Sequence, residues 1–350
     1  MSFVTQRSTW FALLAAACLI AVFWFVRHDS AATVLRLEGS TMGTTWSVLL
    51  GERSTGVDPA DLQLQLQQEL DLINKRMSTY DQTSEISRFN DSSTTDWFPV
   101  SPETVQVVEL ARKISTLSNG AFDVTVGPLV DMWGFGPRPR GERRPTDSQV
   151  EMLLKQVGYR HLSVRRDPAA LRKDVPGLRV DLSAIAKGYG VDRLAEVLVS
   201  KGFINMVVEI GGEMVLKGRH PNGKLWRIAV EKPLPGQRSV ERVFLLTDTG
   251  MATSGDYRNF FTEDGQRFSH TIDPATGRPA RNRLASATVL APTSAEADAL
   301  ATALMAMGDE RAREFCRREK IAAYLLIHQG DGIQAIMTEI FNSATSGAES

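Results

Sequence analysis

The stretch Thr293-Ser294-Ala295-Glu296-Ala297-Asp298-Ala299-Leu300-Ala301-Thr302 predicts that a helix begins late in the chain. It opens with Thr-x-x-Glu, the capping-box pattern that satisfies free backbone N–H groups at a helix start. Asp298 and Thr302 stand four residues apart beyond the cap, so their side chains lie on one helical face. A carboxylate and a hydroxyl are hard oxygen ligands of the kind that Mg²⁺ prefers, usually together with substrate phosphates. This face therefore predicts phosphate chemistry, unless the two side chains simply face water.

Short strands dominate the chain on both sides of that helix. Apolar runs predict strands at residues 33–37, 45–50, 206–210, 214–217, 226–231, 243–246, 269–273, 287–290, 322–327 and 333–337. Capping and periodicity predict further helices after Asp58-Pro59, after Ser101-Pro102, over 146–157, from a strand end at 180–183 to about residue 200, and over 310–319. Because helices and strands mix without strict βαβ alternation, the pattern predicts an α+β fold with largely antiparallel sheets.

The composition excludes several classes of protein. The 350 residues suffice for one large domain or two small ones, and 40 Lys+Arg balance 41 Asp+Glu, so no nucleic-acid partner is expected. Cys18 and Cys316 are the two cysteines, which excludes a disulfide framework. The chain lacks His-Glu-x-x-His, Cys-x-x-Cys, Gly-x-Ser-x-Gly and Walker A patterns. Zinc protease, redox dithiol, serine hydrolase and P-loop functions therefore lose support.

The first thirty residues differ from the rest of the chain. Residues 10–26 carry no charge, a run at the short limit for a membrane-spanning helix. Ala15-Ala16-Ala17-Cys18 is a weak lipoprotein-type cleavage site, but apolar residues continue beyond it. We expect residues 1–30 to be an uncleaved membrane anchor, with a cleaved or lipidated signal as the alternative. Either version exports the predicted domain, residues 31–341, which a flexible tail over 342–350 follows.

The segment Asp181-Leu182-Ser183-Ala184-Ile185-Ala186-Lys187-Gly188 places an acid at a predicted strand end and a lysine in the first turns of a helix. A helix N-terminus suits phosphate, and Lys187 either adds a point charge to a diphosphate or is a solvated helix residue. Gly188 and Gly190 are unfavourable inside a helix, so they indicate close approach of another part of the molecule.

Further motifs lie in turns and loops. Gly211-Gly212-Glu213 is explained by a tight turn between two strands. In the stretch from His270 to Gly277, Asp273 is either reactive or only a turn residue, and His270 is either a base or a loop-holding side chain. Tyr80, Trp133 and Phe135 either stack on a planar ring or form small hydrophobic clusters.

Taken in order, these motifs resemble the ApbE family, the FAD:protein FMN transferases. The resemblance covers residues 37–337 and rests on Thr41-Met42-Gly43-Thr44, Met77-Ser78-Thr79-Tyr80, Gly120-Ala121-Phe122-Asp123-Val124-Thr125-Val126-Gly127-Pro128, Trp133-Gly134-Phe135-Gly136, Val180-Asp181-Leu182-Ser183-Ala184-Ile185-Ala186-Lys187-Gly188, Gly211-Gly212-Glu213, Thr253-Ser254-Gly255-Asp256-Tyr257, His270-Thr271-Ile272-Asp273-Pro274-x-x-Gly277 and Ala295-Glu296-Ala297-Asp298-x-x-Ala301-Thr302.

The resemblance implies a two-lobed, T-fold-like α+β domain with mixed, largely antiparallel sheets and flanking helices. It implies that FAD binds in an extended pocket with Mg²⁺, and that FMN passes to a threonine or serine hydroxyl of a partner protein with release of AMP. The family's known acceptors are subunits of the Na⁺-translocating NADH:quinone oxidoreductase and of the Rnf complex. The domain is then expected on the periplasmic side of a bacterial inner membrane.

Site residues follow from the same resemblance. The implied metal ligands are Asp298, Thr302 and the backbone carbonyl of Ala184. The implied FAD contacts are Met42, Tyr80, Ala121, Phe122, Asp123, Asp181, Lys187 and Ile272. His270 resembles the catalytic histidine, and Asp273 is a second candidate base. Two alternatives remain: an Mg²⁺-dependent FAD diphosphatase that gives FMN and AMP, and a non-catalytic FAD carrier, against which the Asp298 and Thr302 pair argues.

Overall fold

A computed structural model describes residues 34–51, 56–137, 144–234, 239–256, 260–263, 266–280, 283–330 and 332–346. The predicted anchor over residues 1–30 lies outside these ranges, as does Tyr257 of one quoted motif. No helix within the ranges is long and apolar enough to cross a membrane.

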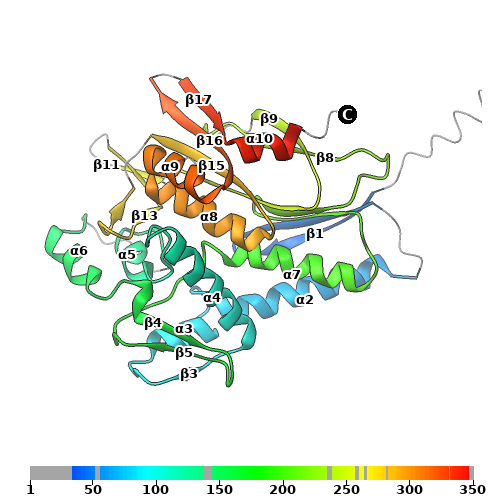
Figure 1. Ribbon diagram of the computed structural model, residues 1–350. Coiled ribbons are helices and arrows are strands. Elements are labelled where there is room, and N and C mark those ends of the chain that lie inside the picture. Colours follow the sequence, from blue (N-terminus) through cyan, green and yellow to red (C-terminus); the bar gives the residue numbers. More distant parts are fainter. Residues whose placement is uncertain are drawn as a thin grey trace, which may run out of the picture.

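An antiparallel sheet forms the centre of the fold (Figure 1). Its eight strands run in the order β1-β2-β6-β7-β10-β15-β16-β17, and every neighbouring pair is antiparallel. Their bounds are Leu35–Thr41, Thr44–Leu50, Met206–Ile210, Glu213–Lys217, Thr249–Gly255, Leu284–Ala291, Ala322–Gln329 and Gly332–Met337. The prediction of an α+β fold with largely antiparallel sheets is confirmed.

Both faces of the sheet are covered, because alternate side chains along each strand enter different cores. Val208 and Leu325 pack with the helices on one face, whereas their neighbours Val207 and Tyr324 pack into a second core on the other. Helices α2 (Pro59–Met77), α7 (Ala186–Ser200) and α8 (Ser294–Met307) cover the first face. The predicted apolar stripe of α2 is buried there and comprises Leu62, Leu66, Leu70, Ile73 and Met77.

The second face is covered by the ribbon β8 (Trp226–Glu231) and β9 (Val240–Leu246) and by α10 (Glu339–Ser346). A flexible tail was predicted from residue 342, but α10 continues to Ser346, and residues 347–350 lie outside the described ranges. The helix forms because the Thr338 hydroxyl accepts the N–H of Phe341, whose buried ring stacks on Tyr324 with centroids 5.9 Å apart.

The remaining elements gather beside α8 as a second lobe (Figure 1). They are α3 (Glu85–Asp91), β3 (Phe98–Pro99), α4 (Pro102–Leu117), α5 (Gly127–Met132), α6 (Asp147–Leu154), the 3₁₀ helix η1 (Tyr159–His161), β4 (Leu162–Arg165) and β5 (Ala170–Lys173). Two hairpins join β11 (Phe260–Glu263) to β12 (Gln266–Ser269) and β13 (Ile272–Asp273) to β14 (Arg278–Pro279), and α9 (Asp309–Glu319) follows α8. The stretch from Ala121 to Pro145 is rich in Gly, Pro and aromatic residues and predicts an ordered loop, but it contains α5.

The segment Val180–Ser183 is not the strand end that was predicted. The Val180 N–H donates to the Asn90 side-chain oxygen at 2.6 Å, and the Asn90 amide donates back to the Val180 carbonyl at 2.8 Å. The Asp181 N–H donates to the Val124 carbonyl at 2.7 Å. The backbone is extended, but an amide side chain and a loop take the places of neighbouring strands.

Lys173 holds the residues before Val180 in place through hydrogen bonds from its side chain. Its buried ammonium donates to the carbonyls of Phe89, Asn90 and Leu178 at 3.1, 3.4 and 3.1 Å. Charged groups are almost never fully buried without partners, so these carbonyls act as a neutral cage for the charge. The cage ties α3 to the residues that lead into Asp181.

We predict that Lys173→Met destabilises the protein by roughly 3 kcal/mol, because three buried carbonyls each lose the hydrogen bond from the Lys173 ammonium. Arg172→Met is the control, since this exposed neighbour on β5 only covers the Trp97 ring. We expect it to cost less than about 1 kcal/mol. Urea unfolding followed by circular dichroism measures both values. Equal losses would show that the cage contributes nothing specific.

Candidate active site

A cavity of about 870 Å³ opens between the two lobes. It is lined by every predicted site residue except Asp273, namely Met42, Tyr80, Ala121, Phe122, Asp123, Asp181, Ala184, Lys187, His270, Ile272, Asp298 and Thr302. Its size falls within the range of cavities that hold small molecules and cofactors. The structure therefore brings together residues that lie up to 260 positions apart, from 42 to 302.

Helices α7 and α8 cross closely beside this cavity, as the two glycines of α7 predicted. A Cβ at Gly188 would lie 2.4 Å from the Ser294 carbonyl oxygen, so only glycine fits. The Asp192 carboxylate accepts the N–H groups of Ser294 and Ala295 at 2.8 and 2.9 Å. Burial raises the pKa of Asp192 to about 6, while these hydrogen bonds favour its charged form.

The capping box predicted at the start of α8 forms only in part. The Thr293 hydroxyl accepts the Glu296 N–H at 3.2 Å, as expected. The Glu296 carboxylate, however, forms an ion pair with Lys113 of α4 at 3.2 Å. The free N–H groups of Ser294 and Ala295 are satisfied by Asp192 instead.

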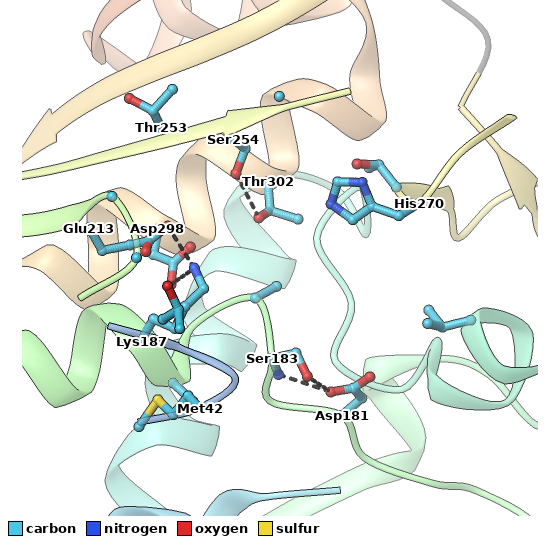
Figure 2. A pocket seen from close by; sticks show the side chains of 18 of the residues that line it. Met42, Asp181, Ser183, Lys187, Glu213, Thr253, Ser254, His270, Asp298 and Thr302 are labelled. Atoms are coloured by element: carbon cyan, nitrogen blue, oxygen red, sulfur yellow. Dashed lines mark hydrogen bonds and ion pairs between the residues drawn. The ribbon is translucent and has the colours of Figure 1, made fainter. Parts of the chain in front are cut away.

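Three charged side chains meet on one wall of the cavity (Figure 2). Lys187 Nζ lies 2.6 Å from Glu213 Oε1 and 3.9 Å from Asp298 Oδ2. The Gly188 N–H also donates to Asp298 Oδ2, at 3.2 Å. Lys187 is thus held at the cavity wall by two carboxylates, a geometry that supports a site residue over a solvated helix residue.

Sequence reasoning missed Glu213. Gly211 and Gly212 do form a tight turn between β6 and β7, with φ of 62° and 111°. Glu213 begins β7 and shares the face of Val215, which packs with the helices, so its carboxylate points toward α7 and α8. An acid at the first position of the strand, directly before the apolar residues Met214, Val215 and Leu216, was the signal that could have identified it.

Burial raises the pKa values of the two carboxylates beside Lys187, those of Glu213 and Asp298. It raises the pKa of Glu213 to about 7 against the opposing effect of the Lys187 ammonium. Burial likewise raises the pKa of Asp298, again opposed by Lys187. Two buried carboxylates compete for one ammonium, so the arrangement favours the arrival of a further cation.

The oxygen atoms beside Asp298 fit a hard divalent cation. Thr302 is on the same face of α8, and its hydroxyl lies 3.3 Å from the Ser254 hydroxyl of β10. The Asp298 side chain is only 3% exposed, and Glu213 Oε2 is buried without a hydrogen-bond partner among the described residues. Across the same residues no group of three or more His, Cys, Asp or Glu could hold a metal. A cation here would need hydroxyl, carbonyl and substrate oxygens, as Mg²⁺ commonly does.

His270 lies on another wall, with Thr302 between it and Lys187 in the view of Figure 2. The strand predicted over 269–273 is interrupted at His270 and Thr271, which turns His270 into the cavity. The Phe135 ring packs edge-on against His270 with centroids 6.4 Å apart. Phe135 stacks in turn on Phe261, at 5.4 Å, so an aromatic cluster supports the histidine.

Asp273 does not line the cavity. Its carboxylate accepts the Ala275 N–H at 3.0 Å, and its carbonyl accepts the Gly277 N–H at 2.8 Å. Of the two alternatives for this residue, the geometry supports the turn residue and not the base, because the carboxylate is used within its own turn.

The predicted FAD contacts offer different groups to the cavity. Tyr80 is 68% exposed at the rim, where its ring face is accessible for stacking. The Asp123 carboxylate instead accepts the N–H groups of Thr125 and Tyr159, both at 2.8 Å, and burial raises its pKa. Asp123 therefore braces its loop. Asp181 accepts the Ser183 N–H at 2.9 Å and orients the turn before α7.

Comparison with known proteins agrees with this geometry. The family model described as "ApbE family" matches residues 42–325. A relative from Vibrio cholerae named FAD:protein FMN transferase is 43% identical over 332 residues, covering 95% of this chain and 97% of the relative. One of the same name from Escherichia coli K12 is 38% identical over 340 residues, covering 93% and 96%.

Solved structures agree as well. The flavin transferase ApbE from V. cholerae superposes with a TM-score of 0.83 at 43% identity, covering 89% of this chain and 99% of that one. The apo form of the Pseudomonas stutzeri flavinyl transferase ApbE gives a TM-score of 0.82 at 36% identity. Because the family model and full-length relatives match the segments that build the cavity, this chain belongs to the ApbE family.

Proposed function

We propose that the chain transfers FMN from FAD to a hydroxyl group of a protein and releases AMP. The full-length relatives named FAD:protein FMN transferase support this activity. The observation that carries it is the joint placement of Lys187, Asp298 and Thr302 on one wall of the cavity and of His270 on another. A protein that only carries FAD does not need charged groups and a proton acceptor on two walls of one cavity.

FAD binding is assigned to the whole length of the cavity. Tyr80 stacks on a planar ring at the rim, and Lys187 neutralises charge on the diphosphate. The N-terminus of α7 adds its positive dipole to the same region. Met42 holds the tip of the β1–β2 hairpin against the cavity, with a positive φ of 49°.

Mg²⁺ is the proposed metal. The Asp298 carboxylate, the Thr302 hydroxyl and the Ala184 carbonyl would hold it. When bound, Mg²⁺ would stabilise negative charge on the phosphate oxygens.

The reaction is a substitution at phosphorus. The acceptor hydroxyl, from threonine or serine, forms a bond to the phosphorus of the FMN half. The bond from that phosphorus to the bridging oxygen breaks, and AMP leaves with the oxygen. His270 accepts the proton of the hydroxyl, because an imidazole side chain can act as a general base in hydroxyl attack.

The proposed acceptor is a subunit of the Na⁺-translocating NADH:quinone oxidoreductase or of the Rnf complex. The proposed location is the periplasmic side of a bacterial inner membrane, with residues 1–30 as the anchor. The family resemblance supports the acceptor, and the uncharged run over residues 10–26 supports the anchor.

The direct test mixes the purified protein with FAD, Mg²⁺ and an acceptor domain, and then measures the intact mass of the acceptor. We expect the acceptor to gain one FMN phosphoester, and to gain nothing when Mg²⁺ is chelated. Free FMN and AMP with an unmodified acceptor would favour a diphosphatase, and unchanged FAD would favour a carrier.

We predict that Asp298→Asn lowers Mg²⁺-dependent transfer by on the order of 100-fold, because a neutral amide is a poor ligand for a hard cation. Glu296→Gln is the matched control, since this carboxylate lies on the same helix but pairs with Lys113. Initial rates over a range of Mg²⁺ concentrations measure the effect. Full activity of Asp298→Asn would refute the metal assignment.

We predict that His270→Ala lowers the transfer rate by roughly 100-fold or more while FAD still binds, because only the proton acceptor is removed. His161→Ala serves as the control, since His161 lies outside the cavity and pairs with Asp174. Flavin fluorescence titration measures FAD binding, and the mass assay measures transfer. A parallel loss of FAD binding would contradict a base role.

A further inference from the structure

Glu213 has no part in the reaction outlined above, yet it is deeply buried beside the cavity. Its side chain is 4% exposed, and only Oε1 has a partner among the described residues, the Lys187 ammonium at 2.6 Å. A buried carboxylate with one unpaired oxygen destabilises the fold, so its presence in the site calls for a role beyond packing.

The position of the Lys187 ammonium suggests that role. The ammonium lies between two carboxylates but is closer to Glu213, at 2.6 Å, than to Asp298, at 3.9 Å. Among the residues that the structure describes, Asp298 receives one close donor, the Gly188 N–H. The short contact with Glu213 therefore keeps Lys187 from forming a full ion pair with Asp298.

The charges of the three side chains lead to the same conclusion. When ionised, Lys187, Glu213 and Asp298 sum to one negative charge, and that charge is left for an incoming cation. Without the Glu213 charge, Lys187 and Asp298 would neutralise each other. The ammonium would then repel a divalent cation at close range.

We propose that Glu213 is a positioning residue that holds the Lys187 ammonium away from Asp298 and so keeps the Asp298 carboxylate available to a divalent cation. This role rests on the proposed function, because it assumes that Asp298 is a metal ligand.

The test measures binding of Mn²⁺, added as its chloride, to the purified full-length protein by the electron paramagnetic resonance signal of free Mn²⁺. We expect Glu213→Gln, which keeps the shape and removes the charge, to bind Mn²⁺ about tenfold more weakly or worse. We expect the double variant Glu213→Gln/Lys187→Met to regain affinity within about threefold of wild type, because the net charge and the access to Asp298 are both restored.

The double variant separates positioning from other roles. If Glu213 ligated the cation or only supported the fold, removal of Lys187 would not restore binding, and weak binding by the double variant would overturn the proposal. Since removing one partner of a buried pair can unfold a protein, the double variant, which removes both charges, is also compared directly with wild type.

Glu209→Gln is the matched control. Glu209 also lines the cavity, but its carboxylate accepts the Gly212 N–H at 2.7 Å and the Ser47 hydroxyl at 3.3 Å. We expect a change below about threefold. An equal loss in Glu209→Gln would overturn the proposal, because net charge alone would explain it. Unchanged affinity in Glu213→Gln would overturn the Glu213 role alone, whereas a wild type that binds no Mn²⁺ would overturn the metal assignment as well.

Discussion

Helices α7 and α8 bring Lys187 and Asp298 together only because residue 188 has no side chain. Any Cβ there would overlap the Ser294 carbonyl, and the two helices would have to separate. Asp192 then fixes the crossing by accepting the first N–H groups of α8. The glycine that weakens α7 as an isolated helix thus permits the contact on which the charged wall of the cavity depends.

The cavity combines two separately supported walls. Lys187, Glu213 and Asp298 project from elements of the main core, which packs the central sheet against α2, α7 and α8. His270 belongs to hairpins held by a smaller aromatic cluster that includes Trp133 and Phe268. The Trp133 indole also donates to the Gly277 carbonyl at 2.9 Å, which locks the turn after His270 to α5. The distance between phosphate-binding and proton-accepting groups is therefore set by how these two cores dock.

Sequence patterns correctly predicted the features that depend on neighbouring residues in the chain, such as strand bounds and the buried face of a helix. The strands β6 and β8 have the predicted bounds, 206–210 and 226–231, and α2 buries the apolar stripe that its leucines predict. The shared face of Asp298 and Thr302 follows from helical spacing alone. Val180–Ser183 was misassigned because its hydrogen-bond partners, Asn90 and Val124, are remote in sequence. The helix after residue 338 was missed because its stability comes from Phe341 packing on Tyr324, a contact that no local pattern contains.

Glu213 was missed for a more instructive reason. Its two preceding glycines have a sufficient explanation in the turn, so nothing local required a further role for the acid. The role arises only when the pleat of β7 aims the carboxylate at α7, where Lys187 already faces Asp298. The turn at Gly211 and Gly212 lets β7 begin beside the crossing of α7 and α8. Glu213, the first residue of β7, can therefore reach Lys187. Chemistry that depends on the balance of three charges can be recognised only once the sheet and the two helices have placed all three.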